Sequence, residues 1–107
     1  MGKDQHDIIN VRTVISLRIL LQTNKAIPIS KKEKSQKDIP ISYGDIAKKA
    51  GIRKATVTKA FNVDGYPYST TLFNMIFALG YTLIESAKVY ESLTDKDIID
   101  FLAEKND

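Results

Sequence analysis

Residues 43–62, YGDIAKKAGIRKATVTKAFN, restrict the possible folds of this chain more than any other stretch. Ser42 is a favoured helix N-cap, and Asp45 three residues later completes an approximate capping box, which predicts a short helix directly after the cap. Gly51 follows at the position where a helix end favours a positive φ angle. The sequence therefore predicts two short helices joined through one glycine, the second at about residues 53–62.

Each of these two predicted helices has one apolar side. In the second helix, Val57, Ala60 and Phe61 have the spacing of a buried stripe. Two short helices joined so tightly cross steeply, and Ala47 is the small residue expected at the crossing. The opposite side of the second helix carries hydrogen-bond donors and no acid: Arg53, Lys54, Thr56, Thr58 and Lys59. Such a side fits a helix in the DNA major groove, although it also fits a surface hairpin with ordinary lysines.

The charge of the chain is divided unequally between its two halves. Residues 1–62 contain thirteen Lys or Arg against five acids, a net charge of +8, and residues 63–107 contain three against eight, a net charge of −5. This polarity indicates one part that faces a polyanion and one part that stays away from it. The basic half contains the two predicted short helices.

The composition excludes several kinds of site. The chain has no cysteine and one histidine, so neither a disulfide framework nor a thiolate zinc site can form. It has no glycine-rich phosphate loop and no paired-ligand spacing, and we therefore expect no enzyme, no catalytic residues, no metal and no cofactor. No apolar run approaches the roughly 20 residues that cross a bilayer, and the N-terminus is too polar for a secretory signal. We expect a single cytoplasmic domain that does not enter the membrane.

Further helices are predicted before and after the central stretch. Residues 1–6 are expected to be disordered, and residues 7–23 to form a mostly buried helix that ends at Asn24 or Lys25, with Arg12 and Arg18 on its solvent side. A second buried helix is expected over residues 69–79, because the following glycine stops it.

The C-terminal part of the chain is less uniform. Residues 81–93 fit an alternating strand and a helix face equally well, and both interpretations stay open. Thr94 and Asp97 then predict the start of a final amphipathic helix, which packs either on the protein's own core or on a second copy. The apolar face expected for it comprises Ile98, Ile99, Phe101 and Leu102.

Residues 25–41 form an unusually long polar connection. Two IPIS sequences flank the charged segment KKEKSQKD, and their prolines exclude a continuous helix. The segment is expected to be a short loose hairpin or an irregular loop. Its lysines either follow a phosphate backbone or are simply solvated; they are Lys31, Lys32, Lys34 and Lys37.

The central stretch resembles the helix-turn-helix of the phage repressor and Cro type, also called the XRE-like family. The matching residues are Ile46, Ala47, Gly51, Ile52, Val57 and the pair Phe61-Asn62. Downstream, PYSTTLFNMIFALG at residues 67–80 resembles the fourth helix of that family. The resemblance implies an all-α bundle of about five helices of the lambda-repressor-like type. It also implies a DNA-binding domain at residues 7–83 and a C-terminal extension at 84–107 that is a candidate for dimerisation.

Two features depart from the family pattern. About seventeen residues join the first and second predicted helices, where the family has only a few. The glutamine that often begins the second helix of the family is Tyr43 here, so the contact with the DNA backbone at this position is expected to differ.

The resemblance also implies which residues face DNA. The residues expected at base edges are Arg53, Lys54, Ala55, Thr58 and Lys59. Arg53 or Lys54 can donate to guanine O6 and N7, which contributes about 1–3 kcal/mol of discrimination. The residues expected at phosphates lie mainly at helix N-termini or carry hydroxyl groups: Ser42, Tyr43, Thr56, Asn62, Tyr68, Ser69 and Thr70.

These observations favour a sequence-specific regulator that binds double-stranded DNA as a homodimer and represses transcription by occupancy. The alternative is the antitoxin of a toxin–antitoxin pair, which binds a toxin protein and regulates its own operon. The segment ALGYTL at residues 78–83 resembles sequences of such antitoxins, and the acidic C-terminal half would complement a basic toxin.

Overall fold

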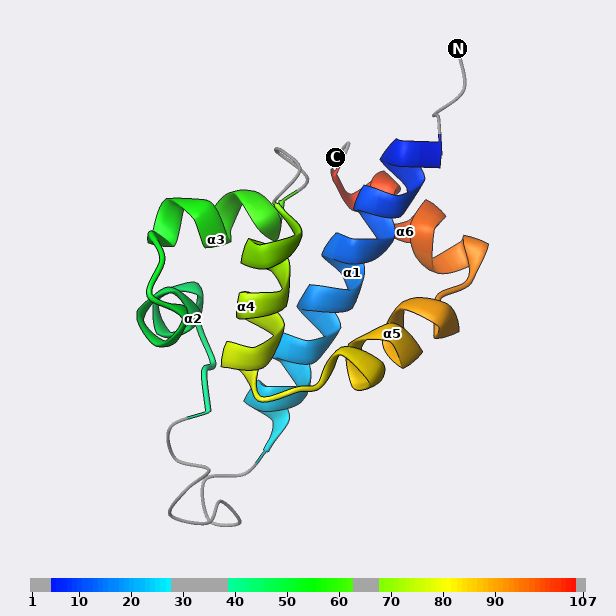
Figure 1. Ribbon diagram of the computed structural model, residues 1–107. Helices are drawn as coiled ribbons and strands as arrows, with labels where there is room; N and C mark the ends of the chain where they lie inside the picture. The colour runs from blue at the N-terminus through cyan, green and yellow to red at the C-terminus, as the bar shows by residue number, and fades with distance from the viewer. Residues whose placement is uncertain (1–4, 28–38, 63–67, 106–107) are drawn as a thin grey trace.

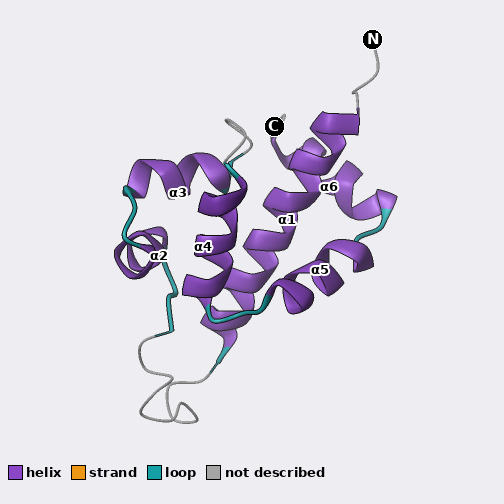
Figure 2. Ribbon diagram, in the orientation of Figure 1, coloured by secondary structure: helices purple, strands orange, loops and turns teal. Residues whose placement is uncertain are grey.

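The fold is built from α-helices throughout residues 5–27, 39–62 and 68–105, which are the parts of the chain that the computed structural model describes. Six helices and no strand occur in these residues (Figures 1 and 2). The helices are α1 (Gln5–Ala26), α2 (Tyr43–Ala50), α3 (Lys54–Ala60), α4 (Ser69–Leu79), α5 (Leu83–Ser92) and α6 (Asp95–Lys105). The predicted all-α class is confirmed, and the count exceeds the expected five because residues 83–92 form a helix.

The longest helix, α1, runs through the middle of the molecule. Figure 1 shows α2, α3 and α4 on one side of it and α5 and α6 on the other. A first core cluster joins α1 to α2, α3 and α4, with Leu17 and Leu21 packed among Ile46, Phe61 and Met75. α1 therefore supplies one wall of the core that supports the two short helices.

A second core cluster joins the N-terminal half of α1 to the end of the chain. Val11 and Val14 pack there against Leu93 and Phe101. The sequence left open whether the final helix packs on the protein's own core or on a second copy. In the structure it packs on the protein's own core. Because α5 and α6 both pack on α1, residues 84–105 are continuous with the rest of the fold.

One residue of the predicted α6 face is placed differently in the structure. Phe101 is buried and Ile98 is half-buried, but Ile99 keeps 64% of its surface exposed. Successive helix positions differ by about 100°, so Ile99 is turned away from the arc that contacts α1.

The helix ends follow the predicted capping chemistry. The Ser42 hydroxyl accepts a hydrogen bond from the Asp45 backbone N–H at 3.1 Å, and Gly51 ends α2 with φ at 70°. The strand interpretation of residues 81–93 is wrong, because Thr82 and Glu85 form a reciprocal capping box that begins α5. α3 is shorter than the expected 53–62, since Arg53 is its N-cap and Phe61 its C-cap.

The bounds of α1 also differ from those predicted. The helix begins at Gln5 rather than Asp7 and continues to Ala26, so Lys25 belongs to its last turn rather than to the polar connection. Residues 1–4, 28–38 and 63–67 lie outside the described residues. Those ranges contain most of the predicted hairpin or loop, with its four lysines, and most of the loop before α4.

No single helix in the described part of the chain is long and apolar enough to cross a membrane. Only α4 and α5 taken together reach the length and apolar composition of a membrane span, and the two helices are bent by 98° at the break between them. Met75, Ile76, Ala78 and Leu79 of α4 are buried in the protein core.

Buried Asn24 connects three segments at the C-terminal end of α1. Its side-chain amide donates to the Pro40 carbonyl at 3.0 Å and to the Leu79 carbonyl at 3.1 Å, and the Tyr81 hydroxyl donates to its Oδ1 at 2.9 Å. Asn24 is 2% exposed, so these carbonyls have no ready replacement for its amide. The residue fixes the segment that enters α2 and the turn that joins α4 to α5.

We expect Asn24→Leu to lower the free energy of unfolding by roughly 2–4 kcal/mol, because it leaves buried carbonyl groups without a donor. Tyr81→Phe removes a single hydrogen bond and is expected to cost about 1–2 kcal/mol. Urea denaturation followed by circular dichroism measures both changes. Thr23→Ala on the exposed neighbouring position is the control, and an equal loss in that variant would contradict the role of Asn24.

Burial, with the nearby Glu85 carboxylate, raises the pKa of Tyr81 above its usual value of 10.0. The folded state therefore favours the protonated hydroxyl that donates to Asn24. This contribution to stability is complete below pH 10 and is lost as the pH rises through the raised pKa.

Candidate nucleic-acid interface

α2 and α3 are joined by a tight turn at residues 51–53. The Ile52 backbone N–H donates to the Ala47 carbonyl at 3.0 Å, and Ala47 is buried as expected for the crossing position. The rings of Tyr43 and Phe61 pack with their centroids 4.8 Å apart. The start of α2 is thereby held against the end of α3.

α2 is also attached to α4. The Asn74 side-chain amide donates to the Ala50 carbonyl at 2.8 Å, which satisfies a carbonyl at the C-terminal end of α2. Together with the shared apolar core, this contact sets the orientation of α2 and hence of α3.

The residues expected to read bases lie at the N-terminus and on the outer side of α3. Arg53, Lys54, Ala55 and Lys59 are exposed, and Thr58 is half-buried. The Thr58 hydroxyl donates to the Lys54 carbonyl at 3.0 Å, so its oxygen retains a free lone pair. No acid interrupts residues 53–62. α3 therefore presents a donor-rich, cationic surface.

Four of the residues expected to contact phosphates are exposed at helix N-termini. Ser42 caps α2, and Tyr68 caps α4 with 83% of its surface exposed, followed by Ser69 and Thr70 in the first turn. Figure 1 shows that this first turn of α4 lies beside the C-terminal end of α3. Hydroxyl groups and free backbone N–H groups thus lie near both ends of α3.

The other three are half-buried. The ring of Tyr43 packs on Phe61, and Thr56 lies in the first turn of α3. The Asn62 amide is engaged inside the protein, since its Nδ2 donates to the Thr58 carbonyl and its Oδ1 accepts from Arg18 at 3.0 Å. Its structural contacts are thus established, and its predicted phosphate contact stays a prediction.

Arg18 is the main residue that the sequence interpretation placed wrongly. It was expected to face solvent, but its Nε donates to the Phe61 carbonyl at 2.8 Å and its guanidinium lies 4.8 Å from the centroid of the Phe101 ring. A cation at the C-terminal end of a helix satisfies terminal carbonyls and complements the helix dipole. Arg18 therefore fastens the end of α3 to α1 and α6. In the sequence, Arg18 stands between the buried Leu17 and the partly exposed Ile19, and this position gave no clear signal of the contact.

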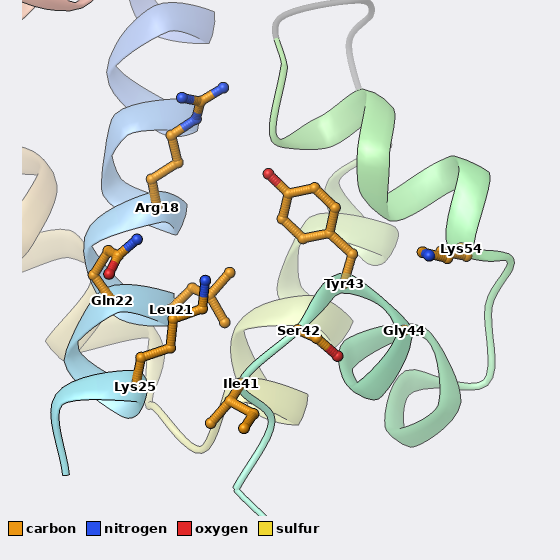
Figure 3. Close-up of a pocket in the computed structure, with 9 residues that line it drawn as sticks. All are labelled: Arg18, Leu21, Gln22, Lys25, Ile41, Ser42, Tyr43, Gly44 and Lys54. Carbon is orange, nitrogen blue, oxygen red and sulfur yellow. The ribbon is translucent and has the colours of Figure 1, made fainter.

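A hollow of about 410 Å³ lies between α1, the start of α2 and the start of α3 (Figure 3). Arg18, Gln22 and Lys25 of α1 line one side, and Ser42 and Lys54 lie on the other. No acid is among the described residues that line it, and the free N–H groups of the α2 N-terminus add positive potential. This arrangement suits a phosphate oxygen.

Gln22 and Lys25 were not predicted as part of the site. Lys25 was expected at the boundary between the first helix and the polar connection, and the extension of α1 to Ala26 places it beside the start of α2. Helical spacing then relates it to Gln22, three residues earlier on the same side of α1.

Within the described residues, no group of three or more His, Cys, Asp or Glu side chains is arranged to hold a metal ion. The comparisons with known proteins add no assignment. No protein-family model matches the chain, and neither the curated proteins nor the solved structures contain a match.

We expect Arg18→Met to lower the free energy of unfolding by about 1–3 kcal/mol, because two hydrogen bonds from a charged group to the end of α3 are lost. Arg18→Lys is expected to lose most of the same stability, since an ammonium group lacks the planar fork that reaches both acceptors. Chemical denaturation measures the effect. Lys25→Met, an exposed position on the same helix, is the control, and full stability in Arg18→Met would contradict the assignment.

Proposed function

We propose that this protein is a sequence-specific DNA-binding regulator of the helix-turn-helix type, with α3 as the recognition helix. The observation that carries the proposal is the outer side of α3. It presents Arg53, Lys54 and Lys59 without an opposing acid, and exposed hydroxyl groups lie near both of its ends. A helix that enters the major groove needs donors for base edges and flanking groups that hold the phosphate backbones.

In this proposal the two helix N-termini position α3. The start of α2 and the hollow beside it take a phosphate through Ser42, Lys25 and backbone N–H groups, and the start of α4 takes another through Ser69 and Thr70. Arg53 and Lys54, at the beginning of α3, reach guanine edges, in line with the usual use of the N-terminal residues of a recognition helix.

The distribution of charge supports one orientation on DNA. The acids of the C-terminal part lie exposed on α5 and α6, which Figure 1 places on the other side of α1 from α2 and α3. They include Glu85, Glu91, Asp95, Asp97, Asp100 and Glu104. Repulsion between these carboxylates and phosphates favours complexes in which α3 faces the duplex.

The proposed architecture is lambda-repressor-like, with α1 to α4 as the helices of the DNA-binding domain that the resemblance implied at residues 7–83, and with α5 and α6 packed on the other side of α1. The proposed mode of action is repression through occupancy of an inverted repeat by a homodimer. Two copies related by a twofold axis read two half-sites about one helical turn of DNA apart.

Selection of bound fragments from a random DNA pool tests the proposal. A palindrome with half-sites about 10 base pairs apart is expected. Recovery of fragments without a shared sequence would overturn the claim of specific recognition.

We expect Lys54→Ala to weaken binding to the selected site by about 1–3 kcal/mol, or roughly 5- to 150-fold, and to relax the base preference at one position. Fluorescence anisotropy titration measures the affinity. Lys96→Ala is the matched control, because Lys96 is an exposed lysine of α6 paired with Asp100. Equal weakening by both substitutions would show that only overall charge is sensed.

A separate prediction concerns the hollow beside α2. We expect Lys25→Ala to weaken binding to specific and random DNA by the same factor and to reduce the slope of log affinity against log salt by about one. Gln22→Ala is expected to weaken both without changing the slope, since glutamine is uncharged. An unchanged salt slope in Lys25→Ala would exclude a phosphate from the hollow.

The second candidate function is that of an antitoxin, and the exposed acids of α6 favour it. Asp95, Asp97, Asp100 and Glu104 offer a surface to a basic protein. Co-expression with the product of the adjacent gene discriminates the two functions. Co-purification with a small basic protein that is lost in Asp100→Lys supports the antitoxin function. If no such protein co-purifies, only the function as a DNA-binding regulator is supported.

A further inference from the structure

An apolar groove of about 330 Å³ lies between α1, α4 and α5, away from the residues of α2 and α3. Leu17 forms its floor, Leu72 and Phe73 line it from α4, and Leu83 and Ala87 line it from α5. Among the described residues that line it, one carries a carboxylate, Glu91 in the last turn of α5.

Large apolar side chains continue both walls of the groove into solvent. Phe77 lies one turn beyond Phe73 on α4 and is 54% exposed, and Ile84 lies beside Ala87 on α5 and is 70% exposed. α4 contains no charged residue, and none of the ten residues of α5 is buried. Among the residues that the structure describes, none therefore covers this face of α4 and α5.

The apolar area is substantial for a domain of this size. Taking about 200 Å² for a whole large side chain, Phe73, Phe77, Leu83 and Ile84 together expose roughly 400 Å². That is near the largest patch of a typical monomer and about half of what each partner buries in a standard interface. The groove walls supply further area.

We propose that a second copy of this chain occupies the groove and forms a twofold homodimer through α4 and α5. A twofold interface places the same patch on both partners, so the patch must offer projections and a recess together. Phe77 and Ile84 are the projections, and the groove beside them is the recess. Glu91 is the one charged residue among the described residues that line the groove, so identical surfaces meet there with little repulsion between like charges.

Other occupants fit this surface less well. A basic protein would require an acidic border, and the groove has a single carboxylate at one end. A lipid surface would require lysine or arginine around the apolar face, and neither is among the described residues that line the groove. The interface also leaves the outer side of α3 free for DNA, because no residue of α2 or α3 lines the groove.

The test is sedimentation equilibrium of the full chain without DNA, from about 5 to 500 µM, a range that brackets a micromolar dissociation constant. The expected species is a dimer with twice the 12.0 kDa mass of the chain. Ile84→Asp is expected to weaken association at least tenfold, because it places a carboxylate in the apolar contact. Ile99→Asp is the matched control, since Ile99 is equally apolar and exposed but lies on α6.

Phe77→Asp provides a second variant from the opposite wall, and circular dichroism checks that each variant is folded. A wild-type chain that stays monomeric over the whole range, or Ile84→Asp that associates as tightly as Ile99→Asp, would overturn the proposal. The proposal deepens the homodimer of the proposed function. Since the measurement contains no DNA, its failure is distinguishable from failure of DNA binding.

Discussion

Burial of α1 is the constraint on which the rest of the structure depends. This helix contributes Leu17, Leu20 and Leu21 to one apolar cluster and Val11 and Val14 to the other. The first cluster also contains residues of α2, α3 and α4 and the second contains residues of α6, so α1 is the helix that the two clusters share. At roughly 1.5–3 kcal/mol for each fully buried side chain, these five residues represent a large share of the stability available to a domain of this size.

Two polar side chains on α1 then convert this packing into a defined geometry. Arg18 binds the carbonyl at the end of α3, and Asn24 binds carbonyls before α2 and at the end of α4. Apolar contacts alone tolerate sliding, whereas hydrogen bonds to particular carbonyls require one register. The orientation of α3 follows from groups that lie outside the two short helices themselves.

The fold also separates three kinds of surface. The outer side of α3 is cationic, the groove between α4 and α5 is apolar and nearly uncharged, and the exposed side of α6 is acidic. Such separation allows one small domain to present an interface for a polyanion and another for a protein without mutual interference. The proposed DNA contact uses the outer side of α3 and the first turn of α4, whereas the proposed homodimer uses α5 and the later turns of α4.

Much of the fold was predictable because its signals are local. The cap at Ser42, the positive φ angle at Gly51 and the apolar spacing of Val57, Ala60 and Phe61 each depend on residues within a few positions of one another, and the structure bears them out. The same holds for the exposed placement of Arg53, Lys54, Ala55 and Lys59. Their roles at base edges stay predictions.

Local sequence signals failed to predict the position of side chains whose contacts are with residues distant in the sequence. Arg18, expected in solvent, finds acceptors 43 and 44 residues away, and Lys25 joins the hollow beside α2 only because α1 extends to Ala26. By itself the sequence determined the helix-forming segments, their caps and the basic character of α3. Only the tertiary structure decided how α3 is held, which residues of α1 join its surface and which apolar face stays open, because those outcomes depend on groups that folding alone brings together.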